Sequence, residues 1–446
     1  MYLKTQRFLI LGVSKSGYAV TKYALGKGAE CYIFEQLKNP KIDSSISDLL
    51  NSGAKYLTEE KVDDVLPDID VLVISPGVPI NHEIAVKCKQ MGKRIIGELE
   101  FGFLQFSPTC VAITGTNGKT TTSVLTDNIL SSFGLNTKLV GNIGVPITKV
   151  IEEINLDTIC VAEVSSFQLE SVSAFCPHIS CIINIAPDHL ERHYTMDNYI
   201  FLKKRIFQNQ RESEFTILNY DDQTVRSFSE STKAKVKWVS IKEKVDGAYR
   251  QNGKLYFNDE FVINESDLAL KGEHNVCDCL FAIAISKLLG VDNECIENAL
   301  KTFKGIKHRI ELVAEKEGIK FYNDSKATNT ASTISAIESM QNPTVLILGG
   351  CEKGEEYYSL FQKIKTSEIK HVVITGASRF NMLEQAGKVG LTDLTVVPDF
   401  ALAVKVAKML ACEGDNVLLS PACASFDNFN GYEERGEAFI KCLEEL

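Results

Sequence analysis

The stretch AITGTNGKTTTSVL, residues 112–125, decides how the centre of this chain folds. The apolar run TCVAITG (109–115) that leads into it is typical of a buried strand, and TTSVLTDNILSSF (121–133) has the spacing of a helix. Between them lies a glycine-rich turn. Backbone N–H groups at a helix start, together with the helix dipole, favour a bound phosphate. The stretch therefore predicts a nucleotide-binding loop between a strand and a helix.

The lysine and threonine at the end of the turn support this prediction. The Lys119 amine would neutralise charge on the β- and γ-phosphates, and the Thr120 hydroxyl would reach Mg²⁺. The usual spacing of such a loop, G-x-x-x-x-G-K-[ST], needs glycine at position 113, where the chain has Ile113, so we interpret the loop as a shortened variant. A plain glycine turn would not explain a Lys-Thr pair at the helix start. The residues expected to bind ATP here are Gly115, Thr116, Asn117, Gly118, Lys119, Thr120 and Thr121.

The length and composition of the chain limit its class. Its 446 residues exceed the usual ~100–200 residues per domain, so we expect two or three domains. Hydrophobic residues make up 44 % and charged residues 24 %, as in soluble globular proteins. The formal net charge of −10 argues against nucleic acid and anionic membranes as partners. No apolar run approaches the ~20 residues that a membrane helix needs.

The thirteen cysteines stand singly in apolar stretches, as Cys160 and Cys181 do, and none forms a CxxC pair. We therefore expect buried, reduced thiols in a cytoplasmic protein rather than a zinc site. The N-terminus runs almost directly into RFLILGV, without the features of a signal peptide.

Apolar runs of strand length alternate with longer helical segments, which predicts an α/β protein with mostly parallel sheets. We expect three domains, with boundaries at residues 1–97, 98–305 and 306–446. The strands expected in the first domain are RFLILGV, ECYIFE, VLVISPG and RIIGE, and those expected in the third are HRIELV, IKFYNDS, TVLILGG, HVVITG and NVLLSPA.

The first block resembles a dinucleotide-binding fold, but its glycine turn is altered. The turn GVSKSG (12–17) has Ser14 where the second glycine of the dinucleotide fingerprint would let a pyrophosphate approach. We therefore do not expect a general NAD site. Glu35, at the end of the second predicted strand, either accepts a hydrogen bond from a ribose hydroxyl or is a solvated strand end.

Acidic and imidazole groups follow two predicted strands of the second block. ICVAEVSSFQLE indicates a strand that ends at Glu163, and CIINIAPDHLERH indicates one that ends near Asp188 and His189. The C-terminal ends of strands line the ligand crevice of an open parallel sheet. These groups would therefore hold Mg²⁺ near the γ-phosphate.

Other polar residues have roles that the residues alone leave open. Lys203, in the predicted helix NYIFLKKRIFQN, is a cation on an amphipathic face, and Asn275 either caps its helix or points to the nucleotide. In the third block, Lys326, Thr328 and Ser425 follow predicted strands and would bind a small anionic substrate.

Taken in order, these motifs resemble those of the Mur ligase family of cytoplasmic peptidoglycan synthesis. The set is GTNGKTT, GNIG, EVSSFQLE, DHLERH, KKRI, GEHN, HRIE and NDSKATN, with SPG and GELEF before it and SPACASFDNF after it. The resemblance implies an N-terminal Rossmann-like domain for a UDP-sugar, a central P-loop ATPase domain and a C-terminal Rossmann-like domain for an amino acid.

The resemblance also implies a reaction. The chain would be an ATP- and Mg²⁺-dependent amide ligase that adds D-glutamate to UDP-MurNAc-L-Ala through an acyl phosphate. Its partners would be these small molecules alone, with no nucleic acid and no membrane insertion, and we expect a cytoplasmic monomer.

Residue roles follow from the same resemblance. Lys119, Glu163, His189 and Lys203 would be catalytic, and Mg²⁺ would be held by Thr120, Glu163, His189 and Lys203, the last as a carbamate. The neighbouring Lys204 is the alternative for this modified lysine. Asn275, Arg309 and Asp324 would hold adenine, phosphate and ribose of ATP. The residues expected to bind the other substrates are Ser14, Lys15, Ser16, Glu35, Ser75, Pro76, Gly77, Asn142, Ser165, Thr328, Lys353, Ser425 and Tyr432.

Two other functions compete with this one. A folylpolyglutamate synthase shares a related ATPase core, but the first block and the SPACASF tail argue against it. A P-loop switch, or a protein that binds a nucleotide sugar without catalysis, would not need Glu163, His189 and Lys203 beside the loop. Within the family, we see no Asp-Asn-Pro-Arg run typical of the branch that adds a diamino acid.

Overall fold

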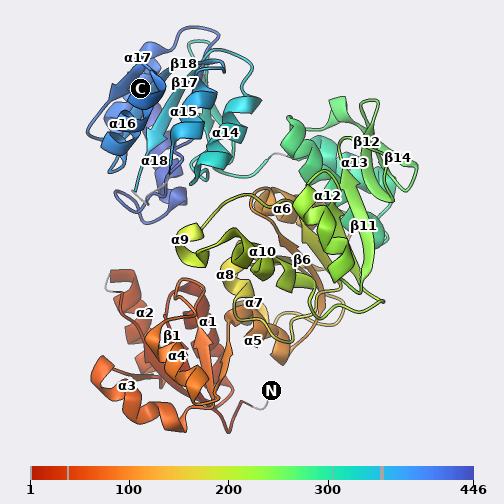
Figure 1. The fold of residues 1–446 in the computed structure, drawn as a ribbon, viewed down its shortest axis with the longest axis vertical. Coiled ribbons are helices and arrows are strands. Elements are labelled where there is room, and N and C mark those ends of the chain that lie inside the picture. Colours follow the sequence, from red (N-terminus) through yellow and green to blue (C-terminus); the bar gives the residue numbers. More distant parts are fainter. Residues whose placement is uncertain (1–2, 38–39, 304, 352–355) are drawn as a thin grey trace. The chain divides into compact units, whose positions relative to one another are not determined.

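The computed structural model describes residues 3–37, 40–303, 305–351 and 356–446. Its strands form three separate sheets, and each sheet is built from strands that follow one another along the chain (Figure 1). By contacts, the chain divides into two compact units. One holds Met1–Leu268 and Asn275–Thr302, and the other holds Ala269–His274 and Phe303–Leu446. The predicted class, a three-domain α/β protein, is confirmed, whereas the exact limits 1–97, 98–305 and 306–446 stay a prediction.

The first sheet has five parallel strands in the order β3-β2-β1-β4-β5. Buried apolar side chains cover both of its faces. All four strands predicted for this domain are present. The strands are β1 (Arg7–Leu11), β2 (Glu30–Phe34), β3 (Lys55–Tyr56), β4 (Val71–Ile74) and β5 (Arg94–Ile96). The helices are α1 (Lys15–Gly26), α2 (Pro40–Asn51), α3 (Glu59–Val65), α4 (Glu83–Gln90) and α5 (Glu98–Gln105), and Leu66–Asp68 form a 3-10 turn.

Helix α1 packs closely on the turn that precedes it. A Cβ atom on Gly17 would lie 1.9 Å from the carbonyl oxygen of Gly12. Only glycine fits at position 17, so the spacing of the two glycines in GVSKSG reflects a close backbone approach.

The second sheet has nine strands in the order β14-β13-β12-β11-β10-β9-β6-β8-β7. It is parallel from β7 to β12, and β13 and β14 complete it as antiparallel hairpins. The strands are β6 (Thr109–Thr114), β7 (Thr137–Gly141), β8 (Ile159–Glu163), β9 (Ile179–Ile182), β10 (Phe215–Asn219), β11 (Lys235–Ser240), β12 (Gly247–Gln251), β13 (Lys254–Phe257) and β14 (Glu260–Asn264).

Short and long helices surround this sheet (Figure 1). The helices are α6 (Lys119–Ser132), α7 (Ile147–Val150), α8 (Ser166–Leu169), α9 (Leu190–His193), α10 (Met196–Lys204), α11 (Gln223–Arg226), α12 (Glu273–Leu288) and α13 (Asn293–Thr302), and Arg205–Phe207, Ser227–Ser231 and Glu265–Asp267 form 3-10 turns. One prediction here is wrong. The strand expected to end near Asp188 and His189 ends at Ile182, and an irregular segment carries the chain to α9.

The third sheet has six strands in the order β15-β16-β20-β17-β18-β19, parallel except for the pair β15–β16. The strands are β15 (Glu311–Lys316), β16 (Ile319–Asn323), β17 (Thr344–Gly349), β18 (Ile369–Thr375), β19 (Leu394–Val396) and β20 (Asn416–Leu419). The helices are α14 (Thr330–Ser339), α15 (Tyr358–Ile364), α16 (Arg379–Val389), α17 (Phe400–Leu410) and α18 (Tyr432–Glu444).

The predicted strand HRIELV begins three residues later than expected, at Glu311. His308 and Ile310 have positive φ angles of 63° and 44°, which a strand does not allow.

The cysteines are free thiols, and most of them are buried. Burial raises the pKa of Cys31 and of Cys160 to about 12, so these thiols stay protonated and unreactive. Cys412 is the exposed one among the described cysteines. Over the described residues, no helix combines the length and apolar character needed to cross a membrane.

Candidate active site

The loop between β6 and α6 has the geometry of a phosphate cradle. Gly118 precedes α6 with φ +83°, and a Cβ atom there would lie 2.3 Å from Oδ1 of Asp278. The backbone N–H groups of Thr116 and Asn117 donate to Oδ1 of Asn184 at 3.1 and 2.8 Å. Asn184, which the sequence did not single out, therefore fixes the loop from the neighbouring strand end.

The Lys119 amine folds back over this loop. It donates to the carbonyl oxygens of Gly115 at 2.9 Å and of Thr116 at 2.6 Å. Thr120, the next residue, is half-buried in the first turn of α6, and Thr121 is buried. Lys119 and the N-terminal end of α6 thus place positive charge at one point, which suits an anionic phosphate.

Glu163, the last residue of β8, is almost fully buried. Asn142 donates to its Oε1 through Nδ2 at 2.7 Å, while Oε2 is buried without a hydrogen-bond partner among the described residues. A buried carboxylate oxygen without a donor is costly unless a cation binds it. The residues present therefore fit Mg²⁺, which prefers oxygen ligands.

Lys203 is fully buried on α10, below the phosphate loop. Its Nζ donates to the carbonyl oxygen of Gly115 at 2.6 Å and to Oγ1 of Thr114 at 3.1 Å. Burial, together with the charge of Lys119, holds the pKa of the Lys203 amine well below its usual value. Lys204 points elsewhere, because its Nζ donates to Ser231 at 2.8 Å. The structure thus places Lys203, and not Lys204, at the loop.

His189 precedes α9 in a left-handed backbone conformation, with φ 54°. Its ring packs against Phe167 at 4.8 Å between centroids. Its Nε2 and Nδ1 lie 3.6 Å from Asp188 and 3.5 Å from Glu191. The carboxylates on both sides orient the imidazole, which stays partly exposed.

Two further buried residues, Tyr199 and His193, pack near the phosphate loop and Lys203. The Tyr199 hydroxyl lies 3.0 Å from Oγ1 of Thr116, and the Lys203 amine lies 5.1 Å from the centre of the Tyr199 ring. The buried His193 packs on Tyr199, and its Nε2 lies 2.9 Å from the hydroxyl of Ser166. Burial lowers the pKa of His193 to about 4, so this imidazole is neutral at pH 7.

The described residues contain no cluster of three or more His, Cys, Asp or Glu side chains arranged to bind a metal ion. The ligand set expected here, which combines one carboxylate and one imidazole with a threonine hydroxyl and a modified lysine, stays a prediction. Ser165, expected to bind substrate, caps α8 and accepts from the backbone N–H of Gln168 at 3.3 Å.

The residues predicted for the first domain gather at the C-terminal ends of β1 and β4. Ser14 precedes α1, Ser16 lies in its first turn, and Pro76 and Gly77 follow β4. Lys15 donates to the carbonyl oxygen of Gly144 at 2.6 Å. The strands β1 and β4 are parallel neighbours, so these residues lie at the same edge of the sheet.

Two members of this group have structural roles. The Ser75 hydroxyl donates to the carbonyl oxygen of Gly12 at 2.7 Å. Glu35 is buried, and its carboxylate accepts from the backbone N–H groups of Val13 at 2.7 Å and Leu37 at 2.8 Å. The alternative that Glu35 is a solvated strand end is therefore wrong.

In the other unit, Asp324 directly follows β16 and is fully buried. Its oxygens accept from Ser420 at 2.7 Å and from the N–H of Ile310 at 3.2 Å, and Nη1 of Arg309 lies 3.8 Å away. Burial raises the pKa of Asp324 to about 6. The structure thus brings Arg309 and Asp324 together, as the prediction of a shared ligand requires. Asn275 is the third residue of α12, in the first compact unit.

The loops after β16 and β20 are joined by α18. Lys326 donates to the Tyr432 hydroxyl at 3.1 Å, and its amine lies 4.8 Å from the centre of that ring. The buried Arg435, which the sequence did not single out, donates to the carbonyl oxygens of Ser325 at 2.8 Å and Cys423 at 3.0 Å.

The remaining substrate residues of this unit lie on the same loops. Thr328 is half-buried and Ser425 is buried. Lys353 lies outside the described residues.

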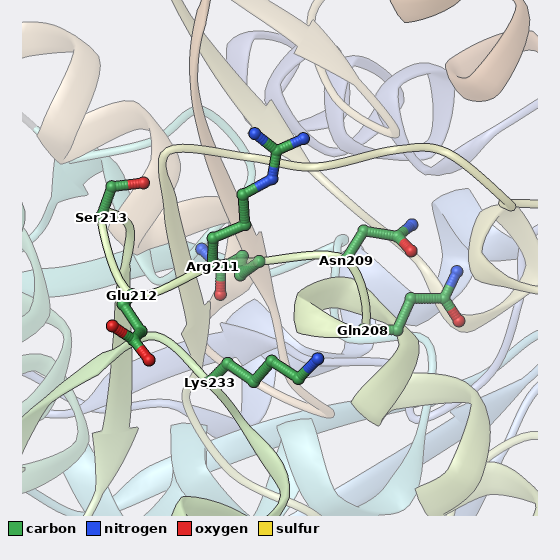
Figure 2. Close-up of a pocket in the computed structure, with 7 residues that line it drawn as sticks. Gln208, Asn209, Arg211, Glu212, Ser213 and Lys233 are labelled. Atoms are coloured by element: carbon green, nitrogen blue, oxygen red, sulfur yellow. The ribbon is translucent and has the colours of Figure 1, made fainter.

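A surface hollow has a lining that includes none of these residues. Its side chains point in different directions and do not converge (Figure 2). The lining residues are Gln208, Asn209, Gln210, Arg211, Glu212, Ser213 and Lys233. None of them belongs to the predicted site, so we do not assign a ligand to this hollow.

Three family models match the chain one after another. They are the Mur ligase MurD-like N-terminal domain over residues 6–97, the Mur ligase middle domain over 113–286 and the Mur ligase glutamate ligase domain over 308–423.

Curated relatives match the whole length of the chain. A UDP-N-acetylmuramoylalanine–D-glutamate ligase of Caldanaerobacter subterraneus subsp. tengcongensis is 41 % identical to this chain. The alignment covers 100 % of both chains. The ligase of the same name from Clostridioides difficile is 40 % identical, with 98 % of each chain covered.

Among solved structures, MurF from Acinetobacter baumannii matches with a TM-score of 0.65 at 17 % identity, over 99 % of this chain and 93 % of that one. The UDP-N-acetylmuramate–alanine ligase MurC from Thermotoga maritima matches with a TM-score of 0.62 at 17 % identity, over 99 % of each chain. At these identities the likeness concerns the fold alone.

Proposed function

This chain belongs to the Mur ligase family, and we infer that it is the ATP-dependent ligase that joins D-glutamate to UDP-N-acetylmuramoyl-L-alanine in peptidoglycan precursor synthesis. The observation that carries this inference is the full-length similarity to relatives of that name. The arrangement of Lys119, Glu163 and Lys203 around one phosphate loop supports it.

The first step joins two anions. The terminal carboxylate of the nucleotide sugar attacks the γ-phosphorus of ATP, the bond to the β-phosphate oxygen breaks, and ADP leaves with an acyl phosphate formed. Lys119 and the N–H groups at the start of α6 offset the repulsion between carboxylate and phosphate. Tyr199 and Thr116 are buried next to this loop, and the low dielectric constant of buried surroundings strengthens these interactions.

The second step makes the amide. The amine of D-glutamate attacks the activated carbonyl carbon, a tetrahedral intermediate forms, and inorganic phosphate leaves as the amine loses a proton. We propose that Asn142, which follows β7, and Lys119, at the start of α6, act as hydrogen-bond donors that stabilise the developing negative charge.

We propose that Mg²⁺ is held by Oε2 of Glu163, the Thr120 hydroxyl, His189 and a carbamate on Lys203. The ion supplies charge neutralisation for the phosphates and for the carboxylate that attacks them. The unpaired, buried oxygen of Glu163 supports this set.

We propose the carbamate on Lys203 from the family resemblance, and the burial of this lysine supports it. Burial lowers the pKa of the amine, and its neutral form has a lone pair that can attack CO₂; one N–C bond forms, one C=O π bond of CO₂ becomes a C–O⁻ bond, and one proton is lost to water. The resulting carbamate is an oxygen ligand, whereas an ammonium group at this position would repel Mg²⁺.

D-Glutamate would bind in the C-terminal domain, to Thr328, Ser425 and Tyr432. Lys353, which the sequence predicts as a further substrate residue, lies outside the described residues. Lys326, which contacts the Tyr432 ring, contributes a cation for the substrate carboxylates. We also propose that the protein works as a cytoplasmic monomer whose partners are its small-molecule substrates.

The direct test is phosphate release with Mg·ATP and UDP-MurNAc-L-Ala, comparing D-glutamate, L-glutamate, L-alanine and L-lysine. We expect release with D-glutamate only, with a matching gain in mass of the nucleotide sugar. Release with another amino acid would move the assignment to another member of the family. Absence of any release that depends on an amino acid would refute the ligase function.

A further inference from the structure

Two segments that are distant in sequence meet inside the first compact unit. One follows β4 and includes the predicted substrate residues Pro76 and Gly77, and the other includes His189 and α9. Nη2 of Arg192 donates to the carbonyl oxygen of Val78 at 2.9 Å and lies 3.5 Å from that of Pro76. The side-chain amide of Asn81 donates to the Tyr194 hydroxyl at 2.9 Å, close to the same place.

The Arg192 guanidinium is fixed on two other sides. Nε and Nη2 donate to the two carboxylate oxygens of Glu170 at 3.0 and 2.6 Å. Both side chains are largely buried, with 13 % and 8 % of their surface exposed. A bidentate, poorly solvated pair of this kind is rigid, in contrast to an exposed ion pair.

The same guanidinium covers the ring of Phe167, with its central carbon 4.9 Å from the ring centroid. Phe167 in turn packs against His189, a predicted Mg²⁺ ligand, and against His193. On the other side, the carbonyls that Arg192 holds belong to the loop whose Ser75 is tied to Gly12. Arg192 therefore contacts the predicted sugar-nucleotide loop directly. It is linked to the predicted metal ligand His189 through the ring of Phe167.

We propose that Arg192 is a positioning residue that sets the loop at residues 75–78 relative to His189. It would fix the distance between the bound nucleotide sugar and the phosphate-transfer site. This role rests on the proposed function, because it concerns the substrate of that reaction. Arg192 is not a catalytic residue, since it touches backbone, Glu170 and Phe167 rather than reacting atoms.

Arginine suits this position for a geometric reason. Its planar fork serves two carboxylate oxygens, a carbonyl oxygen and an aromatic face at once. The single ammonium group of a lysine can keep the charge but cannot serve all four partners, so Arg192→Lys isolates geometry from charge.

The test compares the wild-type protein with R192K and R192A. Arg226→Ala is a matched control, because Arg226 also covers an aromatic ring, that of Tyr220, at 4.8 Å, but has no contact with the first domain in the described structure. For R192K we expect KM for UDP-MurNAc-L-Ala to rise about tenfold, equivalent to about 1.4 kcal/mol, while KM for ATP changes by less than about twofold. Calorimetric binding of UDP-MurNAc-L-Ala without ATP should weaken to a similar degree.

Each outcome is decisive. A merely structural role would lower Tm and kcat through loss of folded enzyme and leave KM and calorimetric affinity unchanged, and so would overturn the proposal. The proposal would also be overturned if R192K had the same KM values and the same calorimetric affinity as the wild-type protein. R192A should show the larger change, and the Lys variant keeps the test valid if R192A does not fold. If the wild-type protein itself neither binds the nucleotide sugar nor releases phosphate with D-glutamate, the proposed function fails, independently of Arg192.

Discussion

Burial determines what single residues of this protein can do. The amine of Lys203 is surrounded by backbone and side-chain oxygens, yet no carboxylate lies close enough to form an ion pair with it in the described structure. Burial and the charge of Lys119 lower the pKa of this amine, which disfavours its charged form, and its neutral form is a nucleophile. Lys204, its neighbour, lies at the surface and has none of these properties.

Replacing Lys203 by Ala should abolish D-glutamate-dependent phosphate release, because the carbamate oxygen that would bind Mg²⁺ is lost. Short carboxylic acids added to this variant should restore part of the rate by supplying that oxygen. Lys204→Ala is the matched control and should retain near wild-type activity. Full activity of K203A would contradict the carbamate.

The burial of Glu98 leads to a prediction of how the free energy of unfolding depends on pH. Its Oε1 accepts from the N–H and the hydroxyl of Thr148, both at 2.8 Å, and its Oε2 is buried without a partner in the described structure. Burial raises the pKa of Glu98 to about 7 from 4.5. The folded state then holds a proton that the unfolded state has lost, so stability should fall between about pH 4.5 and 7 by an amount of order 3 kcal/mol.

The variant Glu98→Gln removes this titration and keeps an acceptor for Thr148. Its Tm should exceed that of the wild-type protein by an amount that grows from pH 5 to pH 8. Glu83→Gln, on an exposed helix surface, should show no such growth. A constant difference across this pH range would contradict the assignment.

At the level of elements, close packing of α1 on the turn before it leads to a second stability prediction. Gly17→Ala would place a methyl group 1.9 Å from the Gly12 carbonyl oxygen, so the helix must shift, at a cost of about 1–3 kcal/mol. Gly26, in the same helix, has no atom within 4 Å of its hypothetical Cβ, so Gly26→Ala should leave Tm unchanged or raise it. Thermal melting of both variants checks the pair, and equal Tm values would refute the packing argument.

Elements with continuous apolar runs could be predicted from the sequence, because a parallel strand buried on both faces needs them. This holds for β1, β6, β8 and β17. The hairpins β12–β14 were not predicted because their strands, GAYRQ, KLYF and EFVIN, are short and include polar residues, so none is a long continuous apolar run. The segment after Ile182 is apolar but turns out of the sheet, since the Thr116 hydroxyl contacts both the N–H and the carbonyl of Ala186.

The predicted site shows the same limit. Lys119 and Glu163 could be placed from a loop pattern and a strand end. Asn184, Arg192 and Arg435 could not, because each acts through contacts between segments far apart in the sequence. Lys203 could be distinguished from Lys204 only through the family spacing; the structure gives the physical reason, since one side chain points inward and the other outward.

At the scale of the whole molecule, the predicted ATP residues are divided between the two compact units. Lys119 and Asn275 belong to one, and Arg309 and Asp324 belong to the other. If one ATP contacts all four residues, we expect its binding to bring the two units closer together. Mg·ATP with UDP-MurNAc-L-Ala should therefore lower the radius of gyration in solution scattering, and each ligand alone should lower it less. An unchanged radius with both ligands would contradict closure.

The distribution of thiols has a practical consequence for observing that motion. Burial raises the pKa of Cys176, Cys295 and Cys442, three of the five partly exposed cysteines, which slows their reaction with maleimides. Cys412, in the turn between α17 and β20, is the exposed thiol among the cysteines described. The natural sequence thus offers one preferred attachment point for a fluorescent dye on the second unit, and a single introduced cysteine on the first would complete a donor–acceptor pair.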